Sequence, residues 1–272
     1  VLNFAYGAFS MFGACFLYVM LTGPQLSFWL ALPVSLVFAG ILAAVLERLF
    51  ARPVLEAPVF TKAIATLALA LVLRTVAQMI WPQLTQTEHF PFPFENAAIS
   101  IGGVYITVSA VAALVVTAVV VAALDLFLTR TRIGVAMRAA ADNRPVARLM
   151  GVPVGRIFLL TWVLAAVVGT LAAILLAAQQ HTIDISYMDP VLILAFVAAV
   201  LGGLESLPGA LIGGICVGLA ENWLALFLAG HQIGSLDIGA PGIRETLIFG
   251  AFVLILLLRP QGLFGKAELR QV

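Results

Sequence analysis

Among the residues whose side chains could bind a ligand or take part in a reaction, the arginines cluster most clearly in this sequence. Six arginines lie in the polar connection 129–156: Arg130, Arg132, Arg138, Arg144, Arg148 and Arg156. The sequence contains no Walker A loop, paired catalytic carboxylates, HExxH or GxSxG. We therefore expect binding rather than bond chemistry. The chain is not expected to be an enzyme, and any energy from ATP must enter through another polypeptide.

The histidines do not indicate a metal site. His89, His181 and His231 fall in three separate loops, without the spacing of metal ligands. We interpret them as solvated polar groups and expect no metal on this chain.

Within the arginine-rich connection, residues 134–156 carry the signals of two short helices. The stretch 135–141 consists of helix formers. Asp142 or Asn143 can cap a second helix, which would have Pro145 in its first turn and Gly151 as its C-terminal stop.

That second helix is predicted to be amphipathic. Val146, Leu149 and Met150 follow the i, i+3, i+4 spacing of one helix face, and Arg144 and Arg148 lie one turn apart. Such a helix can lie on lipid headgroups or dock in a groove of a partner subunit. The absence of aromatic anchors favours docking.

The elements that must position these residues are membrane helices. Of the 272 residues, 63% are apolar and 10% are charged, the net charge is +1 and the mean hydropathy is +1.14. A soluble domain of this size cannot bury so much apolar surface. The composition excludes a soluble enzyme, a nucleic-acid-binding protein and a disordered regulator. Cys15 and Cys216 lie in apolar runs, where we expect no disulfide.

We predict an all-α, polytopic membrane helix bundle of about eight transmembrane segments, in a single transmembrane domain over 1–272. A bilayer crossing needs about 20 mostly apolar residues. The predicted spans are 3–22, 26–50, 60–81, 106–128, 157–179, 188–203, 208–228 and 243–259. The span 188–203 is short, so it is either tilted or re-entrant together with 208–228.

The distribution of basic residues predicts the orientation. The connections 47–62 and 129–156 and the C-terminal tail are basic, whereas the loops 82–105, 180–187 and 229–242 contain no Lys or Arg. Cytoplasmic loops are enriched in Lys and Arg. We therefore expect the C-terminus and both basic connections on the cytoplasmic side.

Polar and small residues interrupt two spans. Asn3, Tyr6, Gly7 and Ser10 either line a substrate pathway or allow close helix packing. In the span 208–228, the small-xxx-small spacing of four glycines favours tight helix contact. These are Gly209, Gly213, Gly214 and Gly218.

The same span contains an acidic residue at membrane depth, Glu221. An intramembrane carboxylate is costly unless it is paired or protonated. We predict a structural ion pair in which Arg74 or Arg244 is the partner, and we hold direct substrate contact as the alternative.

Three stretches resemble the LivH/LivM family, the permeases of branched-chain amino acid ABC importers. They are LNFAYGAFSMFGA at 2–14, the connection 134–152 and LLLRPQGLFG at 256–265. The opening is more similar to the LivH-type branch. Two departures stand out. Tyr6 occupies the usual position of a histidine, so the resemblance does not fix the substrate, and the family has a helix before residue 1, which we expect to be missing from this sequence.

The resemblance identifies the connection at about 129–156 as a cytoplasmic coupling loop that contacts an ATPase. The matching residues are Gly134, Arg138, Ala139, Asn143, Ala147, Arg148, Met150 and Gly151. It also implies partners: a second permease (LivM-like or a second copy), two cytoplasmic ATPase subunits that bind ATP and Mg, and an extracytoplasmic solute-binding protein. The location implied is the inner or plasma membrane.

The implied substrate is a branched-chain or other hydrophobic amino acid. Urea, amides and aromatic acids remain alternatives, because relatives within the broad family transport them. A stand-alone secondary transporter or channel is a further alternative. Such proteins usually carry chains of buried carboxylates or histidines, or an inverted repeat.

Overall fold

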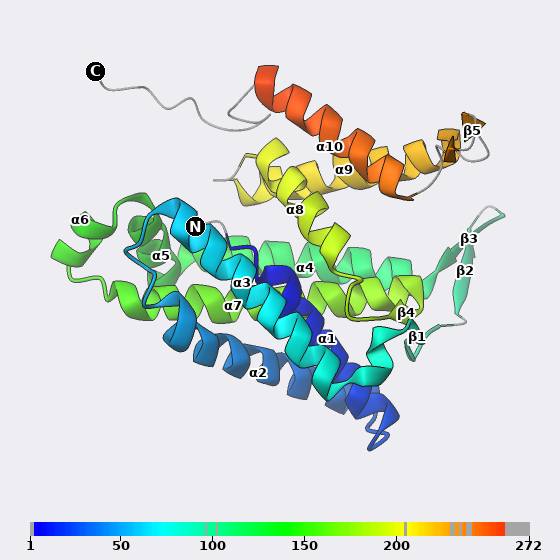
Figure 1. The fold of residues 1–272 in the computed structure, drawn as a ribbon, viewed down its shortest axis with the longest axis horizontal. Helices are drawn as coiled ribbons and strands as arrows, with labels where there is room; N and C mark the ends of the chain where they lie inside the picture. Colours follow the sequence, from blue (N-terminus) through cyan, green and yellow to red (C-terminus); the bar gives the residue numbers. More distant parts are fainter. Residues whose placement is uncertain are drawn as a thin grey trace. The chain divides into compact units, whose positions relative to one another are not determined.

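A computed structural model describes residues 3–95, 97–101, 103–203, 206–228, 232–233, 236–237 and 241–258, and the following ranges and absences refer to these residues (Figure 1). The helices are α1 (Tyr6–Thr22), α2 (Phe28–Leu46), a π-helical turn η1 (Glu47–Ala51), α3 (Val59–Ile80), η2 (Pro82–Thr85), α4 (Val108–Arg130), α5 (Arg132–Asp142), α6 (Arg144–Leu149), α7 (Val154–Gln180), α8 (Asp189–Leu201), α9 (Leu207–Leu228) and α10 (Pro241–Leu258). The short strands are β1 (Glu88–His89), β2 (Ala98–Ile101), β3 (Val104–Thr107), β4 (Thr182–Ile183), β5 (Gln232–Ile233) and β6 (Leu236–Asp237).

The predicted all-α membrane bundle is confirmed, and a helix lies at each of the eight predicted spans. Five described helices are long and apolar enough to cross a membrane: Phe28–Ala51, Val59–Ile80, Val108–Arg130, Val154–Gln180 and Leu207–Leu228. Helix α8 has 13 residues. It is therefore about 20 Å long, less than the hydrocarbon thickness of about 30 Å. Its full crossing remains a prediction.

The chain forms two compact units, residues 1–189 and 190–272. The prediction of a single transmembrane domain over 1–272 remains a prediction. In the second unit, α8, α9 and α10 share an apolar core. Its buried residues are Val197, Ala198, Leu201, Val217, Ile248 and Phe252.

Two of the predicted packing glycines bring α8 and α9 together within the second unit. A Cβ atom on Gly213 would overlap the carbonyl of Ala198, and one on Gly209 would overlap the backbone of Gly202. Gly218 faces open space, with no atom near its Cβ position. Close packing within this subunit therefore accounts for Gly209 and Gly213 but not for Gly218.

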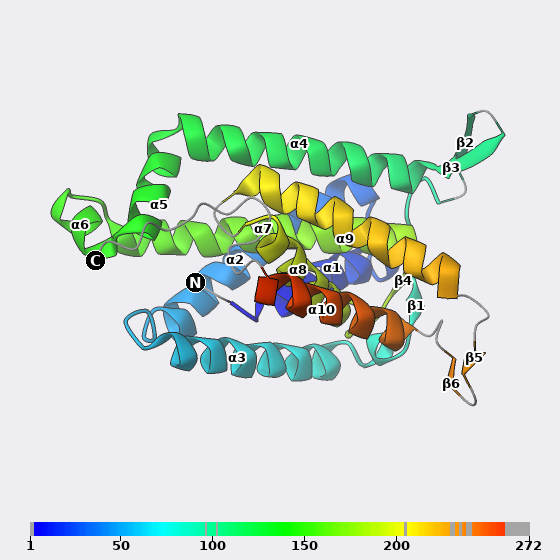
Figure 2. The ribbon, with the colours of Figure 1, turned by 90° about the horizontal axis from the view of Figure 1, so that it is seen from above.

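In the first unit, α4 and α7 lie side by side and are connected at one end by α5 and α6 (Figures 1 and 2). The strand pairs β1–β4 and β2–β3 lie at the opposite end. Within the first unit, the two basic connections thus share one end, and the loops 82–105 and 180–187, which contain no Lys or Arg, share the other. This arrangement agrees with the alternation on which the predicted orientation rests.

Helix α1 is the core of the first unit and packs against α2, α3 and α7. Its contact with α7 leaves no room for larger side chains. A Cβ atom on Gly13 would overlap the side chain of Thr170. Likewise, a Cβ atom on Gly169 would overlap the hydroxyl of Ser10. Ser35 of α2 also donates a hydrogen bond to the carbonyl of Gly13, at 2.7 Å.

We predict that Gly13→Ala destabilises the protein by roughly 1–3 kcal/mol, because the added methyl group overpacks the contact between α1 and α7. The measurement is thermal unfolding of the purified protein in detergent. Gly218→Ala is the matched control, since it also replaces a helical glycine but meets no neighbouring atom. Equal melting temperatures for the two variants would contradict the close-packing account.

Candidate functional site

The predicted coupling loop folds into two helices, α5 and α6, and residues 131–151 are called the coupling segment below. The ends of both helices are fixed by side-chain and backbone caps. The Thr131 hydroxyl accepts a hydrogen bond from the Gly134 N–H at 3.0 Å and so begins α5. Gly134 lies directly on the last turn of α4, where a Cβ atom would overlap the backbone of Phe127 and Leu128. The absence of a side chain at this position therefore sets the corner between α4 and α5.

Helix α6 is capped at both ends. The Asn143 Oδ1 accepts a hydrogen bond from the Val146 N–H at 3.1 Å, which selects Asn143 over Asp142 as the cap. At the other end, the N–H groups of Val152 and Gly151 bond to the carbonyls of Ala147 and Arg148, each at 3.0 Å. Gly151 has φ +82°, the left-handed conformation that this termination requires. The predicted cap and stop of this helix are thus seen in the structure.

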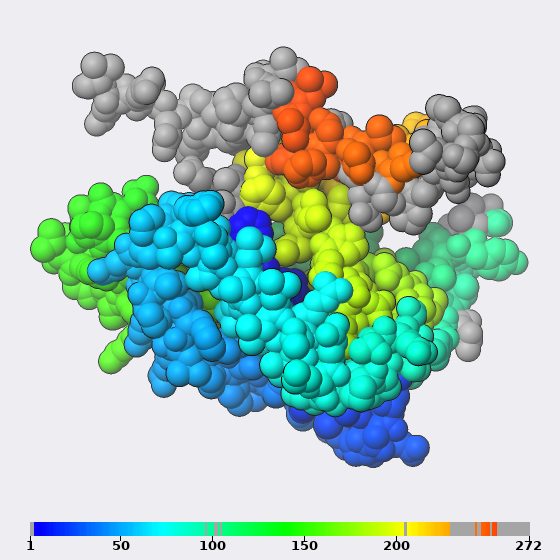
Figure 3. Space-filling view, in the orientation of Figure 1, coloured from blue at the N-terminus to red at the C-terminus, as the bar shows by residue number. Residues whose placement is uncertain are grey.

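One face of the segment is anchored to the membrane helices. Met137 and Ala140 of α5, Ala147 of α6, and Val154 and Ile157 of α7 form a buried apolar cluster. The opposite face is open. Val146 is 51% exposed, and Leu149 and Met150 at the tip are 86% and 79% exposed. In Figure 3, α5 and α6 project from one end of the first unit.

The sequence analysis missed the partner of this segment, the connection between α2 and α3. Arg144 donates to the carbonyl of Leu55 at 3.3 Å, and Arg148 donates through both terminal nitrogens to Glu56 Oε1 at 3.2 Å. The sequence did offer a signal for this contact. The connection 47–62, noted only for its basic residues, also contains two acidic residues, Glu47 and Glu56.

A second link connects the same connection to α7. Glu47 is fully buried, and its Oε1 accepts a hydrogen bond from Arg52 Nε at 3.3 Å. The guanidinium of Arg52 also donates to the carbonyl of Gly155 at 3.3 Å. The first turn of α7, the end of α2 and helix α6 are therefore joined through one short connection.

The eight predicted coupling residues divide into two groups. Gly134 and Ala147 are buried and position the helices. The exposed members are Arg138, Ala139, Asn143, Arg148, Met150 and Gly151. Their contact with an ATPase stays a prediction, as does the cytoplasmic side of the segment.

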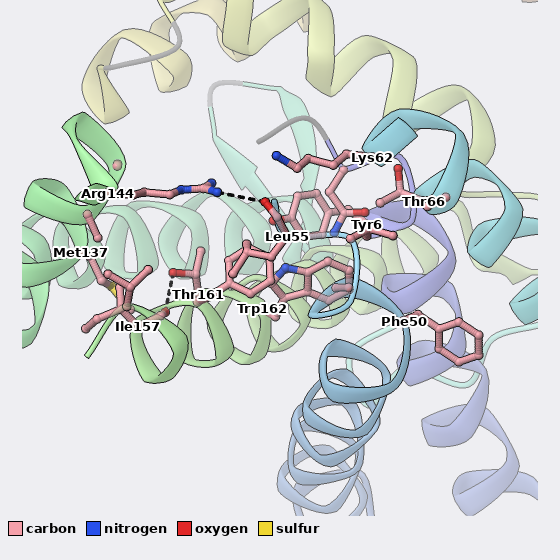
Figure 4. Close-up of a pocket in the computed structure, with 18 of the residues that line it drawn as sticks. Tyr6, Phe50, Leu55, Lys62, Thr66, Met137, Arg144, Ile157, Thr161 and Trp162 are labelled. Atoms are coloured by element: carbon pink, nitrogen blue, oxygen red, sulfur yellow. Dashed lines mark hydrogen bonds between the residues drawn. The ribbon is translucent and has the colours of Figure 1, made fainter. Parts of the chain in front are cut away.

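The predicted pathway residues separate as well. Asn3 and Tyr6 line a cavity of about 220 Å³ beneath the coupling segment (Figure 4). Gly7 is buried, and Ser10 donates a hydrogen bond to the Tyr6 carbonyl at 2.8 Å while it packs against Gly169. The structure therefore places Ser10 in a helix contact and only the first two residues at a cavity.

Arg74 has a partner that the sequence analysis did not name. Its guanidinium contacts Asp189 at 2.6 Å. Glu221 is partly buried in the second unit, and its pairing stays a prediction. The side chain of Arg244 lies outside the described residues, as do His231, the motif residues from 259 onward and the basic residues of the C-terminal tail.

Fold and site together define a multi-pass membrane protein whose arginine-rich connection is folded into a capped pair of helices. Residues 1–261 match the family described as the permease component of the branched-chain amino acid transport system. The chain therefore belongs to this family of membrane permease components, which are not enzymes. The predicted family and the absence of a catalytic role are confirmed.

Known relatives are similar to the chain over most of their length. The chain is 28% identical over 282 residues to the high-affinity branched-chain amino acid transport system permease protein BraD of Pseudomonas aeruginosa, covering 100% of this chain and 88% of the relative. It is 27% identical over 289 residues to LivH of Escherichia coli K12, with the same coverage. It is 29% identical over 268 residues to a probable LivH of Methanocaldococcus jannaschii, covering 97% of this chain and 82% of the relative. No solved structure matches the chain.

We predict that Asn143→Ala loosens α6, because the N–H of Val146 loses its acceptor. The loss of such a cap costs about 1 kcal/mol. Amide hydrogen exchange over 144–149 should therefore accelerate about fivefold. Asn143→Asp keeps the acceptor and should exchange as the unaltered protein does. Unchanged exchange in the alanine variant would show that the cap does not hold the helix.

Proposed function

We propose that this chain is the membrane-spanning permease subunit of an ABC importer in the inner or plasma membrane. It would translocate branched-chain or other hydrophobic amino acids, using ATP hydrolysed by partner subunits. The observation that carries the proposal is the capped α5–α6 segment in a member of this permease family. Its base is fixed to α4 and α7, while its tip exposes Leu149 and Met150.

The geometry of the tip suits a helix that docks in a groove. Apolar residues on one face of a short helix enter such a groove, and surrounding arginines set the orientation. Two cytoplasmic ATPase subunits would hold the α6 helices of two permeases, and ATP with Mg would bind to the ATPases alone. The second permease is LivM-like or a second copy of this chain. A solute-binding protein would deliver substrate at the end that carries the strand pairs.

In this assembly the permease does work through its conformation. When the ATPases close on ATP, they pull on α6, which is joined to the α2–α3 connection and to α7. The membrane helices then exchange inward-facing and outward-facing arrangements. For such a shift, the substrate and the ATPase need only bind the two arrangements with different affinities.

The relatives named as branched-chain amino acid permeases support that substrate class. A urea, amide or aromatic acid importer of the same family is the alternative. A stand-alone secondary transporter or channel is less well supported. Within the described part of the chain, Glu47 is the only buried charged residue, and it is paired with Arg52. A single paired carboxylate does not make a relay for a coupling ion.

Transport assays test the substrate class. The permease is reconstituted in liposomes with its partner permease, ATPases and binding protein, and radiolabelled leucine uptake is followed with ATP inside. We expect ATP-dependent uptake that excess unlabelled leucine suppresses and urea does not, with phenylalanine as a test of the wider hydrophobic class. Leucine uptake without ATP would refute the importer. ATP-driven uptake of urea alone would leave the importer but refute the amino acid.

A charge exchange tests the docking role of Arg148. Arg148→Glu should reduce co-purification of the ATPase about tenfold or more, the usual effect of losing an interface arginine. The exposed pair with Glu56 contributes little to folding, so the variant should remain folded.

The double variant Arg148→Glu with Glu56→Arg separates the two roles of this arginine, because it restores the pair inside the chain. We expect the ATPase to remain lost in the double variant and to be retained in Glu56→Arg alone. If the double variant recovers the ATPase, Arg148 acts only by holding α6, and direct contact is refuted.

A further inference from the structure

The cavity beneath the coupling segment has walls from α1, the α2–α3 connection, α3, the coupling segment and α7, all within the first unit. Tyr6 of α1, Lys62 and Thr66 of α3, Met137 of α5 and Trp162 of α7 are among its lining residues. Most of the lining is apolar, and its volume is about 220 Å³. Trp162 is held in place by Phe9, with ring centres 5.6 Å apart in an edge-to-face contact. The cavity is therefore a preformed apolar space with a rigid aromatic wall.

Two cations also line the cavity. The cationic ends of Lys62 and Arg144 extend toward one another from α3 and α6 (Figure 4). Both also line an adjoining cavity, together with Asp142. Arg144 uses one N–H on the Leu55 carbonyl, and a guanidinium has five. Among the described residues, Lys62 has no ion-pair partner.

A polar group inside the cavity also lacks a well-formed hydrogen bond. Asn3 lines the cavity and is only 8% exposed. Its Oδ1 accepts the N–H of Ala5 at 3.0 Å, whereas its Nδ2 makes no hydrogen bond of standard geometry within the described part of the chain, although the Asn3 side chain interacts with the Tyr6 hydroxyl. A buried donor without a well-formed hydrogen bond is costly, and a ligand that accepts a hydrogen bond would remove this cost.

We propose that this cavity binds a free hydrophobic amino acid that enters from the side of the basic connections. Its carboxylate meets Lys62 and Arg144, which form charge-assisted hydrogen bonds with it. Its apolar side chain lies against Trp162 and Met137. A cavity of about 150 Å³ holds benzene, so 220 Å³ suits roughly nine non-hydrogen atoms, the size of leucine.

The position of the site gives binding a consequence. One wall belongs to the coupling segment and the others to the membrane helices and the α2–α3 connection, so an occupant holds these parts together in this arrangement. Because transport requires them to move, the accumulated amino acid slows its own import. This inference rests on the proposed function, since it takes the occupant to be the transported substrate and the basic side to be cytoplasmic.

The first experiment measures binding in the full assembly without the solute-binding protein, in nanodiscs of zwitterionic lipid. The probe is tritiated leucine. Lys62→Gln should weaken its binding about tenfold or more, and Ala65→Phe should abolish it by filling the cavity. Arg48→Gln and Ala68→Phe are the controls at exposed positions outside the cavity, because the first also removes one cation and the second makes the same change as Ala65→Phe. Two analogues test the role of the carboxylate. Leucine without its amino group, 4-methylpentanoate, should compete for the site better than leucine without its carboxylate, 3-methylbutylamine.

Leucine binding that survives both Lys62→Gln and Ala65→Phe overturns the site. Loss of binding in nanodiscs of anionic lipid, but not of zwitterionic lipid, would assign the cations to a lipid headgroup and overturn it as well.

The second experiment measures ATP-driven leucine uptake in liposomes loaded inside with unlabelled leucine. Internal leucine should slow uptake by the unaltered protein and by Arg48→Gln, but not by Lys62→Gln. If internal leucine does not slow ATP-driven uptake by the unaltered protein or by any variant, the inference is overturned and the proposed function is left intact. The reverse result, Lys62-dependent binding without ATP-driven uptake, refutes the proposed function and supports the site.

Discussion

The close approach of α1 to α7 is the constraint on which the rest of the first unit depends. Lipid offers no hydrophobic drive for helices to associate, so packing and short polar contacts must hold them. Gly13 and Gly169 supply the space, and the Ser35 hydroxyl adds a hydrogen bond to the Gly13 carbonyl. Because α1 is fixed in this way, its first residues lie beside the start of α3 and the first turns of α7. The cavity beneath the coupling segment exists for that reason.

The coupling segment uses a different kind of stabilisation, suited to the edge of the membrane. Its helices are too short to persist by themselves, since isolated helices of this length are marginal in water. Caps at Thr131, Asn143 and Gly151 fix their ends, and one apolar cluster fixes their base. Charged contacts to Glu56 and to the Leu55 carbonyl then set their direction. The result is a firm base beneath an exposed tip.

Much of this arrangement follows from local sequence. Apolar runs of membrane length predicted eight helices, and each is present, because burial in lipid leaves few other solutions. Asn143, Pro145 and Gly151 predicted the second coupling helix for equally local reasons. The contacts of Arg148 with Glu56 and of Arg74 with Asp189 could not be predicted in this way. They join residues about a hundred positions apart, and nothing in the spacing of either partner indicates the other. The role of Ser10 could not be predicted for the same reason, because it depends on packing against Gly169, which is far away in the sequence.

The exposed tip of α6 also bears on how the cell handles this chain before assembly. Leu149 and Met150 present apolar surface to water at the outermost point of the coupling segment. Isolated apolar patches of this kind attract chaperones and proteases, which recognise unburied hydrophobic side chains. If α6 docks on an ATPase as proposed, an assembled subunit hides this surface, whereas an unassembled one displays it. The same few side chains would then report whether the complex is complete and set the lifetime of the unassembled subunit.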